Sequence, residues 1–112
     1  MPQTGDYDRQ LTIEAPVRNR GAAGGVSMRW ELFAQPWARK EDVSGGENRR
    51  GVQIVPEANT MFELNEWIEG LTPKHRVIDN YGTVYDIVAP PREIGRRERA
   101  ILQCVTRDVE VK

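Results

Sequence analysis

Apolar and polar residues alternate along several segments of the chain. Between residues 9 and 17, Leu11, Ile13 and Ala15 alternate with polar residues. From residue 26 the alternation returns, and one set of alternate positions is apolar: Val26, Met28, Trp30 and Leu32. A two-residue period is typical of a strand with one buried face, so we predict a strand in each segment.

Proline and glycine divide these segments. Pro16 is predicted to end the first strand, and residues 18–25 (RNRGAAGG) are predicted to form a flexible, exposed connection. Pro36 has no amide hydrogen for a central ladder, so we predict a bulge or an edge position there. Residues 37–43 (WARKEDV) are expected to continue the second strand in solvent.

The stretch VIDNYGTVYDIV, residues 77–88, predicts a β-hairpin. Two β-branched runs flank Asn-Tyr-Gly, and Gly82 can take the positive φ that a three-residue hairpin loop places at its last position. Residues 92–99 (REIGRRER) are predicted to be a charged loop. Residues 100–111 (AILQCVTRDVEV) predict a final strand with apolar residues on both faces, which indicates burial on both faces.

Residues 59–71 fit two different structures. Thr60 followed by Glu63 has the form of a helix capping box. Apolar residues also recur there at helical spacing: Met61, Leu64, Ile68 and Leu71. Several of the same residues fit the two-residue period of a strand. Local rules alone favour a helix slightly.

Together these elements indicate a mainly β protein. We predict a small antiparallel β-barrel or sandwich of five to six strands, with a long inserted loop and at most one short helix. With 112 residues, the chain is expected to form a single domain over residues 1–112, with an ordered core over about residues 8–108.

The inserted loop comprises residues 44–59 (SGGENRRGVQIVPEAN). It has glycines at its start and in its middle, and no sustained period. A loop of this length inside a compact domain is either functional or disordered. We therefore take it as a candidate functional segment.

The composition argues against several classes of protein. The chain has 16 basic and 17 acidic residues and a net charge of −1, whereas proteins that mainly wrap nucleic acid have a strong basic excess. A single cysteine, Cys104, cannot form an intramolecular disulfide, so a cytoplasmic location is the default expectation. No apolar run approaches the roughly 20 residues that span a bilayer, and the N-terminus has no signal-peptide core, so no membrane contact is expected.

The residue types present do not form a catalytic constellation, so we expect a protein that is not an enzyme. His75 is the only histidine, and no nucleophile signature surrounds Ser27, Ser44 or Cys104. We interpret His75 as a surface residue at the start of a strand. One histidine and one cysteine do not make a zinc site, and GAAGG lacks the lysine of a phosphate loop, so no metal or cofactor is expected.

One basic cluster has the charge to approach nucleic acid: Arg92, Arg96, Arg97 and Arg99. Glu93 and Glu98 lie among these arginines and lower the local charge from +4 to +2. No aromatic side chain lies within the cluster to stack on bases. A solvated loop or a subunit interface is therefore favoured over base recognition, and the same ambiguity applies to Arg49 and Arg50.

The chain resembles the phage head-tail joining proteins, also called head-closure or stopper proteins. The resemblance covers about residues 8–108 and rests on the order and spacing of five segments: DRQLTIEAP, GGVSMRWE, WARKEDVSGGE, LTPKHRVIDNYGTVYDIV and AILQCVTRD. Two segments depart from the family pattern. MFELNEWIEG is acidic where relatives alternate arginine and aromatic residues, and GENRRGVQ replaces a helix-prone segment.

The resemblance implies a structural role in a virion. It implies a small β-barrel with a long loop, assembled in the bacterial cytoplasm as a ring of six or twelve copies. The ring would lie at the head-tail junction of a phage, prophage or gene transfer agent particle, between the portal or adaptor and the tail terminator or tail tube. There it would close the channel around packaged double-stranded DNA and provide the surface to which the tail docks.

The resemblance also bears on the conflict at residues 60–69. It implies a strand there, because tertiary pairing can override a local propensity of about 1 kcal/mol or less per residue.

Two candidate functional segments follow. The first is a channel or plug loop: Ser44, Gly45, Gly46, Glu47, Asn48, Arg49, Arg50 and Gly51. The second is a basic loop at a subunit interface or near DNA: Arg92, Arg96, Arg97 and Arg99. The alternative is a small oligonucleotide-binding β-barrel with an exposed Trp37 or Tyr85. Exposure of Tyr85 or Ile87 would also indicate a contact with a second subunit.

Overall fold

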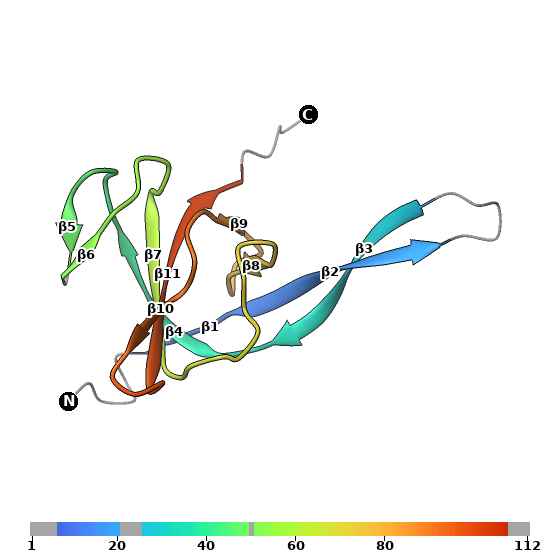
Figure 1. Cartoon of the computed structure of the whole chain (residues 1–112), viewed down its shortest axis with the longest axis horizontal. Coiled ribbons are helices and arrows are strands. Elements are labelled where there is room, and N and C mark those ends of the chain that lie inside the picture. The colour runs from blue at the N-terminus through green and yellow to red at the C-terminus, as the bar shows by residue number, and fades with distance from the viewer. Residues whose placement is uncertain (1–6, 21–25, 50, 108–112) are drawn as a thin grey trace.

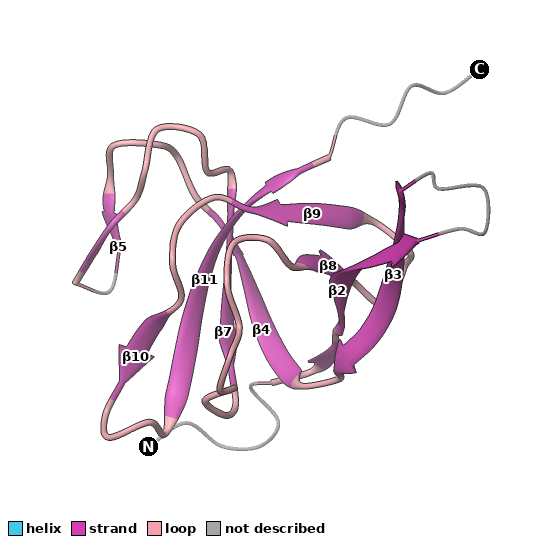
Figure 2. Cartoon of the chain, turned by 45° about the vertical axis from the view of Figure 1, so that its right-hand side comes forward, coloured by secondary structure: helices cyan, strands magenta, loops and turns pink. Residues whose placement is uncertain are grey.

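The chain folds as a curled antiparallel β-sheet (Figures 1 and 2). The structure, a computed structural model, describes residues 7–20, 26–49 and 51–107. The strand order in the main sheet is β1-β4-β7-β11-β9-β8-β2-β3, with β10 paired to β11, while β5 and β6 form a separate two-stranded sheet. The described residues contain no helix. The predicted mainly β class is confirmed, although the strands outnumber the five or six expected.

The strands are β1 (Arg9–Gln10), β2 (Thr12–Arg20), β3 (Val26–Ala34), β4 (Trp37–Asp42), β5 (Asn48–Arg49), β6 (Val52–Gln53), β7 (Thr60–Leu64), β8 (Arg76–Ile78), β9 (Val84–Ile87), β10 (Arg92–Ile94) and β11 (Arg99–Thr106). Several of these strands have only two or three residues. Such short strands do not produce a readable alternation in the sequence, which explains why the predicted number was too low.

The first predicted strand is bent at Leu11 into β1 and β2. β1 pairs with β4, whereas β2 pairs with β3 and β8. Leu11 is fully buried between them, and its amide donates a hydrogen bond to the Pro36 carbonyl oxygen at 2.9 Å. Because β1 stands at one end of the strand order and β2 stands next to the other end, this bend curls the sheet into a half-barrel.

The prediction that Pro16 ends the first strand was wrong. Pro16 lies within β2 opposite Trp30, beyond the Thr12–Glu14 segment that pairs with β8. Proline is tolerated in a strand where one edge has no ladder to complete. The predicted connection therefore begins later: residues 18–20 belong to β2, and residues 21–25 lie outside the described residues.

β2 and β3 form a two-stranded arm that projects from the rest of the molecule (Figure 1). Their register shifts between Ile13 and Glu14. Ile13 pairs with Ala34 and Glu14 pairs with Leu32, so Phe33 is the extra residue of a β-bulge. A bulge bends its strand and increases the local twist. The arm gives the molecule its elongated dimensions of 53 × 30 × 23 Å.

Pro36 interrupts the strand as predicted, but it lies in the connection between two strands and not at a bulge or an edge position, and the solvated continuation after it was also wrong. β3 ends at Ala34 and β4 begins at Trp37. β4 pairs with β1 on one side and with β7 on the other, and Ala38 is fully buried. The chain thus turns at Pro36 from the arm into the interior of the sheet.

β7 and β11 lie between two hydrophobic clusters. Successive side chains of a strand point to opposite faces. The inner cluster includes residues from six strands and the loops beside them: Leu11, Ile13, Ala38, Phe62, Leu64, Leu71, Val77, Tyr85, Ile87, Ala100, Leu102 and Cys104. On the outer face, Met61 and Ile101 join a smaller cluster. The predicted final strand is confirmed as β11 with burial on both faces, over Arg99–Thr106; residues 108–111 of the prediction lie outside the described residues.

β7 settles the conflict between helix and strand. Thr60–Leu64 form a strand that pairs with both β4 and β11, so the helix favoured by local rules was wrong. The strand implied for residues 60–69 is correct only as far as Leu64. Beyond it, Trp67 and Ile68 are half-buried against the inner cluster without belonging to a strand.

The predicted hairpin is confirmed, with β8 paired to β9. Gly82 has a φ of 87°, and its amide donates to the Asp79 carbonyl oxygen at 3.1 Å. Tyr85 and Ile87 are both buried within the chain, with 2% and 4% of their surfaces exposed. They therefore do not supply the exposed contact that would have indicated a second subunit.

Candidate assembly surface

Residues 44–59, which include the predicted plug loop and which we call the plug segment, are folded against the sheet. Within this segment, β5 and β6 pair through Asn48 with Gln53 and Arg49 with Val52. The turn before β5 is closed by the Glu47 carboxylate, which accepts a hydrogen bond from the Ser44 amide at 2.6 Å. The predicted long loop is therefore partly regular, and Val52 and Ile54 in its second half are alternate residues that are buried in the outer cluster.

This segment is anchored to the outer face of the sheet by apolar and polar contacts. The outer cluster consists of Val43, Val52, Ile54, Ala58, Met61 and Ile101. Gln103 on β11 adds two hydrogen bonds. Its Oε1 accepts from the Val55 amide at 2.7 Å, and its Nε2 donates to the Gln53 carbonyl oxygen at 3.1 Å.

The two limbs of the segment also touch through their backbones. A Cβ atom at Gly45 would collide with the backbone of Pro56, so only glycine fits at this crossing. The Gly46 amide donates to the Ile54 carbonyl oxygen at 2.9 Å, and the Ile54 amide donates to Glu47 at 2.9 Å. The exposed residues of the predicted plug loop are Ser44, Gly45 and Gly46 before β5, Asn48 on it and Gly51 after it; we call residues 48–51 the tip.

The predicted basic loop divides into two parts. β10 pairs with β11, with Arg92 opposite Ile101 and Ile94 opposite Arg99. The prediction of a loop over residues 92–99 was therefore wrong: these residues form a hairpin with its turn at residues 95–98. Arg92, Arg96 and Arg97 are exposed on this hairpin. Arg97 is restrained by an ion pair of 3.3 Å to Glu69 and by a hydrogen bond of 2.9 Å from its amide to Glu93.

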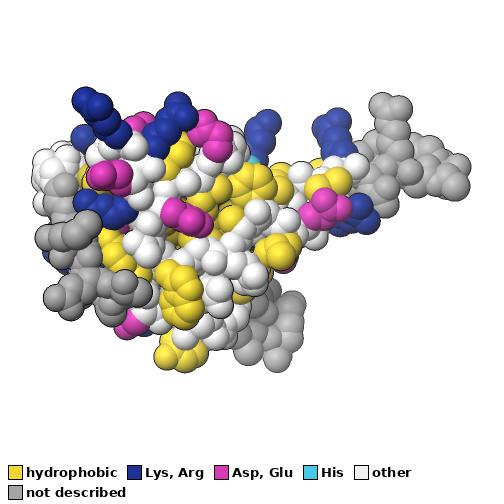
Figure 3. Space-filling model, turned by 90° about the horizontal axis from the view of Figure 1, so that it is seen from below, with side chains coloured by type: hydrophobic (Ala, Val, Ile, Leu, Met, Phe, Trp, Pro, Cys, Tyr) yellow, Lys and Arg dark blue, Asp and Glu magenta, His cyan; other side chains and the backbone are white. Residues whose placement is uncertain are grey.

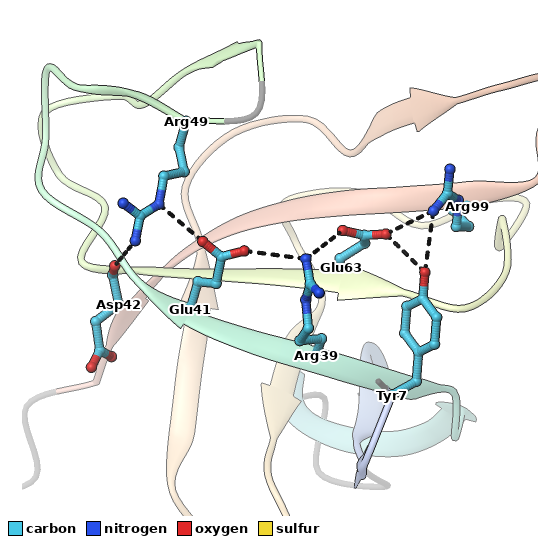
Figure 4. Close-up of polar contacts among 7 residues, drawn as sticks. All are labelled: Tyr7, Arg39, Glu41, Asp42, Arg49, Glu63 and Arg99. Atoms are coloured by element: carbon cyan, nitrogen blue, oxygen red, sulfur yellow. Dashed lines mark hydrogen bonds and ion pairs between the residues drawn. The ribbon is translucent and has the colours of Figure 1, made fainter. Parts of the chain in front are cut away.

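Arg99 faces a different environment, centred on Glu63 of β7 (Figure 4). Glu63 Oε2 accepts hydrogen bonds from the Tyr7 hydroxyl at 2.8 Å and from Arg99 Nη1 at 3.1 Å. Arg39 Nη2 lies 3.6 Å from the other carboxylate oxygen. Burial raises the pKa of Tyr7, and the hydrogen bond to Tyr7 raises the pKa of Arg99.

The same polar network continues to the plug segment (Figure 4). Glu41 on β4 lies 3.5 Å from Arg39 Nη2 and accepts a hydrogen bond from Arg49 Nε at 2.9 Å. Arg49 Nη2 also donates to the Asp42 carbonyl oxygen at 3.5 Å. Two residues that the sequence analysis assigned to separate candidate loops, Arg49 and Arg99, are thus joined by one chain of contacts.

Four residues in the middle of this network were not predicted from the sequence: Tyr7, Arg39, Glu41 and Glu63. One signal was available in the sequence. Glu63 lies within the apolar run TMFEL, and a carboxylate in such a run requires a partner when the run is a buried strand. Glu63 is 5% exposed. Its partner Arg39 lies directly opposite on β4. This partner could be predicted only if the pairing of β4 with β7 were known.

The network borders a small cavity of about 140 Å³, lined by Glu63, Ile94, Arg99 and Ile101. Pockets that enclose small-molecule ligands typically have volumes of roughly 300–1,000 Å³. This cavity is therefore too small for such a ligand. In the described part of the chain, no three histidine, cysteine or acidic side chains gather as a metal site would require.

His75 is buried, so its interpretation as a surface residue was wrong. Its ring centroid lies 4.3 Å from that of Phe33, and its Nδ1 lies 3.1 Å from the Thr72 hydroxyl. A turn closed by the hydrogen bond from the His75 amide to the Thr72 carbonyl oxygen directs the ring inward. Cys104 is also buried, and burial raises the pKa of its thiol, which disfavours the reactive thiolate.

The two aromatic residues of the oligonucleotide-binding alternative have different environments. Trp37 is 49% exposed. Tyr85 is buried, and its hydroxyl donates to Asp79 at 3.0 Å. Only one of the two is therefore available to stack on a base. Within residues 7–20, 26–49 and 51–107, no helix is long and apolar enough to cross a membrane.

These features define a small all-β scaffold with exposed hairpins and an exposed Trp37. The model of the phage head completion protein family matches residues 2–108. The chain therefore belongs to the phage head completion proteins, a family of structural phage head proteins. This assignment agrees with the resemblance seen in the sequence.

Two solved structures share the fold. Protein SF1141 from Shigella flexneri 2a is 19% identical, with a TM-score of 0.73, and the match covers 94% of this chain and 96% of that chain. A chain from the virion of a native gene transfer agent particle is 22% identical, with a TM-score of 0.54, and the match covers 95% of this chain and 94% of the other. No curated protein matches the chain.

Proposed function

We propose that this protein is the head-closure component of a phage-like particle. In this proposal, six or twelve copies form a ring at the head-tail junction, between the portal or adaptor and the tail terminator or tail tube. The ring closes the channel after DNA packaging and presents the surface to which the tail docks. The observation that carries the proposal is the family match over residues 2–108.

The position in the particle is an extension of that family assignment. One structurally similar chain comes from the virion of a gene transfer agent, and the proposal gives this chain the same kind of setting. Assembly would take place in the bacterial cytoplasm. The shape of the chain agrees with such a role, because a ring requires two different contact patches on each copy, and this molecule has a compact body and a projecting arm.

The tip of the plug segment is our candidate for the part that faces the DNA channel. Arg49 is paired with Glu41 and Glu47, and the second basic residue, Arg50, lies outside the described residues; the charge of Arg50 would suit non-specific proximity to phosphates. In the rest of Ser44–Asn59, Val52, Ile54 and Ala58 are buried in the outer cluster and anchor the segment to the sheet. The working part is therefore expected to be short. Arg92, Arg96 and Arg97 form the second candidate, on the β10–β11 hairpin.

Deleting the gene from a strain that produces the particles tests the proposal. We expect heads that package DNA but lose it on purification and carry no tails, when they are examined by electron microscopy and assayed for protected DNA. A plasmid copy of the wild-type gene should restore tailed, DNA-filled particles. Tailed particles that retain DNA without the protein would contradict the proposal.

The role of the tip is tested in the same complementation assay. A variant with Arg49→Ser and Arg50→Ser keeps the length of the segment and its buried residues. It should restore tails but retain less DNA than the wild type. The matched control is Arg92→Ser with Arg96→Ser, which removes two exposed arginines from the other hairpin. Full DNA retention by the Arg49/Arg50 variant would exclude the tip as the channel-facing element.

A further inference from the structure

One face of the arm is apolar and exposed. Directly opposite residues of paired antiparallel strands point to the same face. The register therefore places three pairs on one face of the arm: Glu14 with Leu32, Pro16 with Trp30, and Arg18 with Met28. Met28 is 59% exposed and Leu32 is 63% exposed. We call Arg18, Met28 and Leu32 the arm face.

Met28 and Leu32 are exposed and belong to neither hydrophobic cluster of the described part of the chain, whereas Glu14 and Trp30 on the same face contact Arg76. β3 pairs only with β2, and no described residue of β3 belongs to the buried core of either cluster. The opposite face of the arm is more polar and carries the Arg29–Glu31 ion pair at 2.6 Å. A two-stranded arm with an exposed apolar stripe is marginally stable alone, so a contact with another molecule would account for both its length and its composition.

The base of the arm is held firmly. Arg76 lies over the Trp30 ring at 4.3 Å and pairs with Glu14 at 2.7 Å. Arg107 lies 6.0 Å from the same ring and pairs with Asp86 at 2.6 Å. These contacts join the arm to β8 and to the end of β11, so the arm face is presented in a fixed orientation. Figure 3 shows hydrophobic side chains that extend from the body onto the arm.

A complementary patch exists on the body of the same molecule. Two large aromatic residues are exposed there, Trp37 and Tyr81, in the ranges that the structure describes. Tyr81 already has a cationic partner, because the Arg9 guanidinium lies 5.6 Å from its ring. Trp37 is 49% exposed at the start of β4.

Two exposed acidic residues, Asp8 and Glu66, belong to backbone segments that lie beside Trp37. The Asn65 amide donates to the Trp37 carbonyl oxygen at 2.9 Å, and the exposed Glu66 directly follows Asn65 in the chain. Asp8 is also exposed, and it precedes Arg9, which pairs with Ala38. We call Trp37, Asp8 and Glu66 the Trp37 surface. Its negative charge complements Arg18 on the arm face.

We propose that the arm face of one copy packs on the Trp37 surface of a second copy. This inference rests on the proposed ring and names the contact that closes it. Each copy uses two different patches, so the contact is heterologous and repeats around a closed ring. Met28 and Leu32 supply apolar area, Trp37 is the aromatic anchor, and Arg18 meets Asp8 or Glu66 at the rim.

Two variants test the contact by sedimentation velocity and electron microscopy of the full-length chain. Met28→Glu with Leu32→Glu changes the arm face, and Trp37→Ala changes the Trp37 surface. Trp30 is left intact because it supports Arg76 and Arg107. All three positions are exposed, so each variant should keep the wild-type far-UV circular dichroism spectrum. Each should weaken self-association about tenfold or more.

Mixing the two variants gives the sharper result. Each still has one intact patch, so the mixture should form dimers but no larger species, whereas either variant alone stays monomeric. Ala15→Glu with Val17→Glu adds the same charges to the opposite arm face and should leave assembly intact. The matched control for the Trp37 change is Tyr81→Ala.

The outcomes separate this inference from the proposed function. If the variants form rings as the wild type does, or if the mixture forms no dimers, the contact is wrong although a ring can still exist. A wild-type protein that stays monomeric at its highest attainable concentration overturns the contact as well. The gene-deletion assay then decides independently whether the protein closes heads.

Discussion

Arg99 Nη1 lies 3.1 Å from Glu63 Oε2, and both side chains lie over the outer face of the sheet, where β11 and β7 pair. Glu63 is 5% exposed, so its charge is stabilised by partners rather than by water. Arg39 approaches the same carboxylate from β4, and Tyr7 reaches it from the segment before β1. One acidic residue therefore ties together four segments that are distant in the sequence.

Replacing Glu63 with glutamine should destabilise the protein. The change removes one of the two carboxylates beside Arg39 and the carboxylate that is hydrogen-bonded to Arg99, although both arginine side chains are 27% exposed and can be partly hydrated. We expect the free energy of unfolding, measured by urea denaturation, to fall by about 1–3 kcal/mol. Glu31→Gln is the matched control in an exposed pair and should change it by no more than about 0.5 kcal/mol. Equal effects at both positions would contradict a structural role for the network.

The parts of the fold that depend on local chemistry could be predicted from the sequence. Gly82 determines the β8–β9 hairpin because the turn needs a positive φ, and the apolar run of β11 indicates burial on both faces. The strand at Thr60–Leu64 was different. Its local pattern favoured a helix, and only pairing with β4 and β11 overrides that preference.

The candidate surfaces depended on tertiary structure and could be predicted only in part. The arginines at the two hairpin tips were identified by charge. The network that joins Arg49 to Arg99 required β4 and β7 to lie side by side, which no local rule determines. The length of the arm could not be predicted because of Pro16. A proline indicates the end of a strand unless one edge of that strand, here β2, is known to be unpaired.

Gln103 should control how firmly the plug segment is attached to the sheet. Gln103→Leu keeps a similar side-chain size but removes the hydrogen bonds to the Val55 amide and the Gln53 carbonyl oxygen. We expect faster hydrogen exchange at the Val55 amide and a loss of about 1–3 kcal/mol in the free energy of unfolding. Gln35→Leu, at an exposed position after β3, should leave both quantities nearly unchanged. Unaltered exchange at Val55 in the Gln103 variant would show that the apolar cluster alone holds the segment.

Gly82→Ala should weaken the β8–β9 hairpin through backbone strain alone. A Cβ atom at this position has open space around it, but the φ of 87° is unfavourable for a residue with a side chain. We expect thermal and urea denaturation to show a loss of about 1–2 kcal/mol. Gly82→Asn should lose less, because asparagine tolerates positive φ better than alanine does. If the two variants are equally stable, the conformation of the turn is not the cause.

Tyr85 should make the stability depend on pH in the alkaline range. Burial and the hydrogen bond to Asp79 raise the pKa of Tyr85 from 10.0 to about 12. A raised folded-state pKa means that the unfolded chain loses this proton first as the pH rises. The associated stability is therefore complete below about pH 10 and is lost progressively between pH 10 and 12.

The variant Tyr85→Phe isolates this effect because phenylalanine does not titrate. Urea denaturation at a series of pH values gives the difference in free energy of unfolding between the wild type and the variant. That difference should be constant below pH 9 and should decrease by about 2 kcal/mol on reaching pH 12. Other alkaline groups, including Tyr7, titrate in both proteins and cancel in the difference. A difference that stays constant to pH 12 would mean that the Tyr85 hydroxyl ionises equally easily in the folded and unfolded chains.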